Sequence, residues 1–161
     1  MFCFGGICVL YPMNVDLTGC LVIIIGGGAV AERKVRGVLA AGETAFVRVI
    51  APEITAQLRV SVDDGRIEWH SVCYTYGMLE GAFLVYAATD SATVNAKVAA
   101  EAKERGILVN VIDDLSASSF QIPSSVRRGN FLLTVSTGGR SPALSRAIRM
   151  ELEQLYPEAF G

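Results

Sequence analysis

The sequence predicts an α/β protein whose core is a doubly wound parallel sheet, followed by a small α+β segment. Three observations support this fold class. Short apolar runs alternate with amphipathic helical patterns between residues 20 and 111, which is typical of repeated βαβ units. A turn of three glycines joins the first apolar run to the first helical pattern. Acidic residues are absent from residues 115–150, directly after Asp114, which indicates a change of segment.

Five apolar runs are the predicted strands, because strands buried on both faces of a parallel sheet read as continuous apolar stretches. They cover residues 20–25, 45–50, 67–71, 83–87 and 107–111. Helices are predicted over residues 29–41, from about Pro52 onward, and over residues 91–105. Gly42 and Gly106 are typical stops for the first and third helices, and Ser91 is a typical N-cap. Right-handed crossovers then favour helices on both faces of the sheet.

The composition limits the class of protein. The 161 residues carry a net charge of −2 and are 52% apolar, which argues against a nucleic-acid-binding chain and against a disordered one. No apolar stretch reaches the roughly 18 residues that a membrane helix needs, so no membrane partner is expected. The apolar residues 1–11 lack the basic start and the cleavage site of a secretory signal. We interpret them as an extension of a cytoplasmic protein.

The cysteines and the single histidine predict no metal site. Cys3, Cys8, Cys20 and Cys73 form no C-x-x-C pair, and His70 is the only histidine, so the usual zinc-ligand spacings are absent. We interpret the thiols as reduced cytosolic cysteines and the histidine as a packed or surface residue.

The change after Asp114 predicts a boundary between residues 1–114 and residues 115–161. The second segment is predicted to hold strands over residues 119–122 and 131–136 and a helix over residues 142–155. Two strands and one helix are too few elements to fold alone. The segment should therefore dock on the first part, on a partner chain, or on both.

Arginines are the only charged side chains in residues 115–150. They are Arg127, Arg128, Arg140, Arg146 and Arg149. One interpretation is that they bind a substrate with several carboxylates or phosphates. The other is that they line a solvated face or pair with acids of a partner chain.

The glycine turn predicts dinucleotide binding. Gly26, Gly28 and Ala31 match the G-x-G-x-x-G/A spacing between a strand and a helix. In that arrangement the first glycine makes the tight turn, the second admits a pyrophosphate at the helix N-terminus, and the small third residue lets the helix pack on the strand. The alternative is a turn with a structural role only.

An acid after the second strand is the next element of this fingerprint, because it holds the ribose hydroxyls. Glu53 follows the second predicted strand and is a displaced candidate; the alternative is that it stabilises the dipole of the helix that begins near Pro52. No arginine ends that strand, which favours NAD over NADP, although Arg48 and Arg59 lie nearby in sequence.

Polar residues follow two further strands at the edge where doubly wound sheets bind ligands. Asp113 and Asp114 end the fifth strand, and one of them could serve as a general base; the alternative is a solvated turn. Thr89 and Asp90 end the fourth strand, as cofactor contacts or as a turn that leads into Ser91.

A second glycine-containing turn joins the strand and the helix of the second segment. Ser141 and Pro142 are typical first residues of a helix, and Thr137, Gly138 and Arg140 precede them. Glycines and an arginine at a helix N-terminus suit an anion, so this turn is the predicted substrate-binding element of the segment.

Several motifs in order resemble one family, the precorrin-2 dehydrogenases, which form the dehydrogenase and chelatase module of siroheme synthase. The likeness covers about residues 11–156. The motifs are Tyr11-Pro12, the run from Gly26 to Lys34, Ala51-Pro52-Glu53, Ala87-Ala88-Thr89-Asp90, Asn110-Val111-Ile112-Asp113-Asp114, Ser119-Phe120 with Pro123, Ser136-Thr137-Gly138-Gly139 and Ser141-Pro142.

The resemblance implies a Rossmann domain over residues 1–114 and a dimerisation and substrate-binding segment over residues 115–161. It implies NAD-dependent oxidation of precorrin-2, a polycarboxylate tetrapyrrole, to sirohydrochlorin for siroheme or cobalamin, by a homodimer. Some members of the family also insert ferrous iron. Asp113 falls on the family's essential aspartate, the proposed general base. The implied cofactor contacts are Gly26, Gly27, Gly28, Ala29, Val30, Pro52, Glu53, Thr89 and Asp90, and Ser119 joins Thr137, Gly138 and Arg140 as a substrate contact.

Two features depart from the family or leave another class open. The family continues into a helical third domain, which this chain is expected to lack or to have truncated. The alternative function is an NAD-sensing regulatory module. Such modules usually end the second strand on an acid, whereas Ala51-Pro52 stands here.

Overall fold

A computed structural model of the protein describes residues 10–42 and 44–161. Cys3, Cys8 and most of the predicted N-terminal extension lie outside the described residues. The chain divides into two compact units, one of residues 15–120 and one that combines the N-terminal residues up to Asn14 with residues 121–161. The first unit thus continues to Phe120, beyond the predicted boundary at Asp114.

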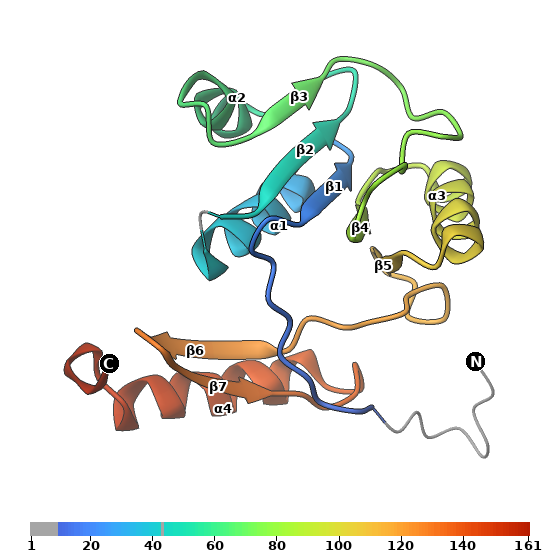
Figure 1. The fold of residues 1–161 in the computed structure, drawn as a ribbon. Helices are drawn as coiled ribbons and strands as arrows, with labels where there is room; N and C mark the ends of the chain where they lie inside the picture. The colour runs from blue at the N-terminus through green and yellow to red at the C-terminus, as the bar shows by residue number, and fades with distance from the viewer. Residues whose placement is uncertain (1–9, 43) are drawn as a thin grey trace. The chain divides into compact units, whose positions relative to one another are not determined.

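The first unit is built on a parallel sheet of five strands in the order β3-β2-β1-β4-β5 (Figure 1). The strands are β1 (Leu21–Ile25), β2 (Phe46–Ile50), β3 (Glu68–His70), β4 (Leu84–Ala87) and β5 (Leu108–Val111). The direction of winding reverses between β1 and β4, and this switch point is where doubly wound sheets bind ligands, at the carboxyl ends of the strands. The predicted fold class is confirmed.

Helices cover both faces of this sheet. α1 (Ala29–Ala41) and α2 (Ala56–Asp63) contribute to the apolar core on one face, and α3 (Ala92–Arg105) to the core on the other. Successive side chains of β1 point to opposite faces of the sheet and so contribute to different cores. Ile24 faces α1 and Ile23 faces α3, and both are fully buried.

Two predicted elements differ from the structure. α2 begins at Ala56, with Thr55 as its N-cap, because residues 52–55 form a loop against the glycine turn rather than a first helical turn. Residues 119–122 form no strand, because the Ser119 hydroxyl and backbone N–H bond to Val109 of β5 and end the first unit there.

The second unit consists of an antiparallel hairpin and a helix that lies along it (Figure 1). The hairpin strands are β6 (Ser124–Arg128) and β7 (Phe131–Val135), and they are followed by α4 (Pro142–Leu155) and the short 3-10 helix η2 (Glu158–Phe160). Arg128 joins the hairpin to the chain end by donating to the carbonyl of Tyr156 and pairing with Glu158. Among the described residues, no helix combines the length and apolarity that a membrane span requires.

Candidate cofactor and substrate site

The glycine turn between β1 and α1 is shaped by two close backbone approaches. Gly26 has φ +125°, and a Cβ there would overlap the carbonyl of Ala88. A Cβ at Gly27 would overlap the carbonyl of Glu53. Both positions therefore require glycine for reasons internal to the protein, one because of the β4 end and one because of the loop after β2.

Gly28 differs from its neighbours because its surroundings are open. A Cβ there would meet no atom within 4 Å, and its φ of −84° suits any residue. Gly28 is also the N-cap of α1, and no side chain caps that helix, so the first N–H groups of α1 are left for an anion. Ala31 is fully buried, which lets α1 pack closely on the sheet. This geometry fits a dinucleotide pyrophosphate.

The loop after β2 carries Glu53 beside this turn. The backbone N–H of Thr55 donates to the carbonyl of Gly27 over 3.0 Å, and the Thr55 hydroxyl donates to Glu32 of α1 over 2.8 Å. On its other side the loop is held by Ser71, which donates to the carbonyl of Pro52. The Glu53 side chain itself is exposed. A backbone fixed in this way holds residue 53 beside the glycine turn that precedes α1.

Both arginines near this loop have partners. Arg48 pairs with Glu68 of β3 over 2.7 Å, and Glu68 also contacts His70. The pKa of Glu68 lies below its ordinary value because of its hydrogen bonds to His70 and Arg48. The guanidinium of Arg59 stacks over the ring of Trp69 at 4.0 Å. Both partners, Glu68 and Trp69, belong to β3, the strand that pairs with β2.

The end of β4 is held by a buried amide. Asn95 of α3 accepts from the N–H and hydroxyl of Thr89 and donates to the carbonyl of Thr89 over 2.9 Å. Asp90, the next residue, is exposed. Thr89 thus forms the structural turn that leads into α3, and its outer surface lies in the wall of a cleft with Asp90.

This cleft, of about 660 Å³, brings the polar ends of β4 and β5 together. Asp113 and Asp114 line it with Thr89 and Asp90, and alanines of α3 complete the wall. The turn after β5 therefore faces the N-terminal end of α3, as the prediction of a shared ligand edge requires.

The two adjacent aspartates have different environments. Asp114 accepts from the N–H and hydroxyl of Ser116 and from the N–H of Ala117, and these bonds lower the pKa of Asp114. Asp113 has φ +56°, in the left-handed region, and its carboxylate has no hydrogen bond or ion pair within the described part of the chain. The structure thus leaves Asp113 open to a ligand and uses Asp114 to hold the turn.

The predicted substrate residues of the second unit lie in a tight turn. The Thr137 hydroxyl accepts from the N–H of Ser141 and lies 3.2 Å from the Ser145 hydroxyl, so it organises the start of α4. Gly138 has φ +64° and Arg140 is exposed. Their assignment to substrate binding stays a prediction, as does that of Ser119.

The arginines of this unit divide into two groups. Arg128 binds the carbonyl of Tyr156, and Arg149 pairs with Glu153 on α4. The other three are exposed, and their guanidinium groups make no hydrogen bond or ion pair within residues 10–42 and 44–161; they are Arg127, Arg140 and Arg146. Only this second group is available to bind an anion.

A lysine that the sequence interpretation did not single out lies on the α1 face of the sheet. Lys34 is half-buried, and its Nζ donates to Asn110 Oδ1 of β5 over 3.0 Å and lies 5.0 Å from the ring centroid of Tyr86. Burial lowers the pKa of Lys34, and the charge of Arg33 lowers it further. The two partners are 76 residues apart in sequence, so only the fold brings them together.

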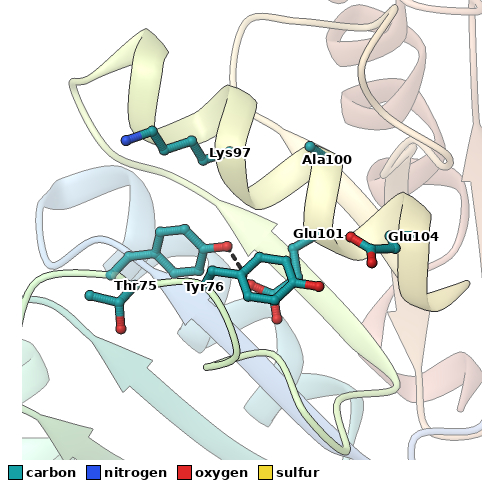
Figure 2. A pocket seen from close by; sticks show the side chains of 7 residues that line it. Thr75, Tyr76, Lys97, Ala100, Glu101 and Glu104 are labelled. Atoms are coloured by element: carbon teal, nitrogen blue, oxygen red, sulfur yellow. Dashed lines mark hydrogen bonds between the residues drawn. The ribbon is translucent and has the colours of Figure 1, made fainter.

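A smaller hollow of about 480 Å³ lies between the β3–β4 connection and α3, and none of the predicted site residues lines it. Figure 2 shows Lys97, Glu101 and Glu104 along α3 with Thr75 and Tyr76 opposite. The described residues contain no group of three or more histidine, cysteine, aspartate or glutamate side chains placed to hold a metal ion.

Comparisons with known proteins agree with this geometry. A protein family described as "Putative NAD(P)-binding" matches residues 13–124. The siroheme synthase of Photorhabdus laumondii is 43% identical over 150 residues, which cover 93% of this chain and 32% of that protein. The siroheme synthase of Chromobacterium violaceum is 42% identical over 94% of this chain. The chain thus spans about a third of the length of these relatives.

A solved structure extends the likeness to three dimensions. "SirC, precorrin-2 dehydrogenase" is similar with a TM-score of 0.77 and 30% identity, over 94% of this chain and 73% of that one. The sheet order and the glycine turn define a Rossmann-type NAD(P)-binding domain. The chain belongs to this NAD(P)-binding family, in the group formed by precorrin-2 dehydrogenases and the dehydrogenase module of siroheme synthases.

Proposed function

We propose that this chain is an NAD-dependent precorrin-2 dehydrogenase that acts in the cytoplasm and converts precorrin-2 to sirohydrochlorin. The observation that carries the proposal is the pairing of an open glycine turn, at Gly28, with an unpartnered carboxylate, at Asp113, on the same edge of one parallel sheet. The family membership supplies the substrate, because the similar solved structure is a precorrin-2 dehydrogenase.

The cofactor would be held by the glycine turn and the loops beside it. Gly28 and the first N–H groups of α1 would bind the pyrophosphate, with Gly26, Gly27, Ala29 and Val30 forming the turn. Pro52 and Glu53 would contact the ribose, and Thr89 and Asp90 would contact the cofactor at the end of β4. Bound NAD supplies the acceptor for the two electrons and one proton that leave the substrate as a hydride.

Asp113 is the residue that would take the second proton. Its carboxylate is exposed in the cleft and has no partner in the described structure, so it is free to accept a proton from the tetrapyrrole. Asp114 would position the base by holding the turn through Ser116 and Ala117.

NAD rather than NADP is proposed because of the charges around the ribose position. Glu53 would repel a 2′-phosphate, and the arginines that could attract one are engaged with Glu68 and Trp69. Titration with each nucleotide tests this: NAD should bind at least about tenfold more tightly than NADP. Equal affinities would contradict the assignment.

The second unit would bind the substrate and form a homodimer. Arg127, Arg140 and Arg146, with Thr137 and Gly138, would contact carboxylates of precorrin-2, and Ser119 at the end of the first unit would contribute a further contact. Dimerisation is supported by large apolar side chains that this unit leaves exposed, which include Leu144, Met150, Leu155 and Phe160. Light scattering should give twice the mass of 17.2 kDa; a monomer at micromolar concentration would contradict it.

An anaerobic absorbance assay tests the activity. Precorrin-2 and NAD should yield NADH together with the spectrum of sirohydrochlorin. Ferrous iron added afterwards tests the chelatase activity, in which the four nitrogens of the tetrapyrrole would bind the metal as a substrate. Binding of both ligands without NADH formation would contradict the dehydrogenase and favour an NAD-sensing module.

A further inference from the structure

We propose that Lys34 and Asn110 form a subsite for a carboxylate of the substrate, on the α1 face of the sheet. This inference rests on the proposed function, because it takes a carboxylate-bearing tetrapyrrole as the ligand. Its starting point is a charge without a counter-ion. Among the described residues no carboxylate lies within ion-pair distance of the Lys34 ammonium, although the side chain is half-buried.

The immediate surroundings of the ammonium are neutral. They are Asn110 of β5 and the ring of Tyr86 of β4, against which Phe120 packs edge-on at 5.8 Å between ring centroids. An ammonium has three donors, and the amide oxygen of Asn110 accepts from one of them. The cation of Arg33 adds to the positive potential there, as its lowering of the Lys34 pKa shows. A bound anion would accept hydrogen bonds from the remaining N–H groups of Lys34 and would balance its charge.

The orientation of the Asn110 side chain is fixed by a second hydrogen bond, so Lys34 and Asn110 are already positioned before a ligand binds. The Asn110 amide nitrogen donates to the carbonyl of Phe120 over 3.2 Å, so its oxygen is directed at Lys34. A neutral hydrogen-bonding side chain could tie α1 to β5 equally well. The charge of Lys34 is therefore not explained by that structural role.

The place of the pair in the fold favours the substrate over the cofactor phosphates. Asn110 precedes Asp113 by three residues on the same strand and turn, at the β4–β5 side of the sheet. The pyrophosphate position is the glycine turn at the start of α1, and the ribose position is the loop after β2. Lys34 thus lies near the β4–β5 edge of the sheet that carries the proposed base, on the opposite face of the sheet from α3.

Variants of Lys34 test the subsite through binding and turnover. Lys34→Met removes the charge and keeps the length, Lys34→Arg keeps the charge, and Lys97→Met, at an exposed position of α3, is the matched control. Titration with sirohydrochlorin, followed by absorbance, should show about tenfold weaker binding for Lys34→Met or more, with recovery in Lys34→Arg. The Kd for NAD and the melting temperature should change little.

Three results would overturn the inference. They are tetrapyrrole binding by Lys34→Met equal to that of the wild type, a loss confined to NAD, and an equal loss for both ligands with a lower melting temperature. The first two would remove the carboxylate subsite or assign the charge to a cofactor phosphate, and the third would make Lys34 a structural tie. Wild-type turnover of precorrin-2, measured first, separates these results from a failure of the proposed function.

Discussion

The hydroxyl of Tyr74 donates a 2.5 Å hydrogen bond to the carboxylate of Glu101, a fully buried acid on α3. The dashed line in Figure 2 marks this contact. The N–H groups of Gly77 and Leu79 and the guanidinium of Arg105 complete the coordination of the same carboxylate. The connection between β3 and β4 contains no helix. The hydrogen bonds to Glu101 instead attach this connection to α3, which covers that face of the sheet.

This relationship predicts a pH-dependent stability. Burial alone raises the pKa of Glu101, but the bonds from Tyr74, Gly77 and Leu79 outweigh it, so the pKa lies below the ordinary 4.5. A depressed pKa in the folded state means that the stabilisation is present above the unfolded value and is lost as the pH falls through the folded value. Tyr74→Phe should lower the free energy of unfolding at pH 7 by about 1.5–3 kcal/mol.

Denaturant titrations of this variant across pH 2–7 provide the measurement. The difference between wild type and Tyr74→Phe should shrink toward low pH, where Glu101 is protonated. Tyr76→Phe is the matched control, since Tyr76 is exposed, and it should have a much smaller effect. A difference that stays constant across this pH range would contradict the assignment.

Asp113→Asn tests the proposed base. Asparagine tolerates the left-handed conformation at φ +56° and has the same shape, so the turn should persist. Turnover should fall about tenfold or more with the Kd for NAD nearly unchanged. In Asp114→Asn the amide oxygen can still accept from Ser116, so turnover should stay closer to wild type. Equal effects of the two variants would argue that the turn, and not the base, was lost.

Alanine at two adjacent glycines should separate folding from cofactor binding. Gly27→Ala places a Cβ against the backbone carbonyl of Glu53 and should cost about 1–3 kcal/mol of stability or more. Gly28→Ala meets no protein atom, so the melting temperature should hold while NAD binding weakens about tenfold or more. Calorimetry of both variants, with and without NAD, distinguishes the effects. Unchanged NAD affinity in Gly28→Ala would place the pyrophosphate elsewhere.

The two groups of arginines predict different substitution effects. Glutamine at Arg127, Arg140 or Arg146 should raise the KM for precorrin-2 and reduce its salt dependence, because each removes a charge available to substrate carboxylates. Arg149→Gln should leave this KM unchanged, because that guanidinium is paired with Glu153. Steady-state kinetics at several salt concentrations provide the test; a KM for NAD that rises equally would indicate a general loss of structure.

The sheet was predictable from sequence because its central strands are buried on both faces and read as continuous apolar runs. The start of α2 was missed because Pro52 is typical of a first helical turn, whereas the backbone there bonds to the glycine turn. The predicted strand over residues 119–122 failed for a similar reason, since the Ser119 hydroxyl pairs with β5 and interrupts the extended run.

Within the site, sequence pattern located the groups but not their partners. The sequence alone does not distinguish Asp113 from Asp114. Their roles differ because Asp114 accepts hydrogen bonds from Ser116. The contact between Lys34 and Asn110 joins two elements that no local periodicity relates. Hydrogen-bond partners set by tertiary packing leave no periodic signal in the sequence.

The contact between Gly27 and Glu53 is made by backbone atoms alone, through the Glu53 carbonyl. The side chain at position 53 is therefore uncoupled from the packing that maintains the glycine turn. Natural variation or engineering could exchange this acid for a neutral or basic residue, and so redirect nucleotide preference, without rebuilding the loop. Position 53 is in this sense a variable element on a scaffold fixed by main-chain contacts.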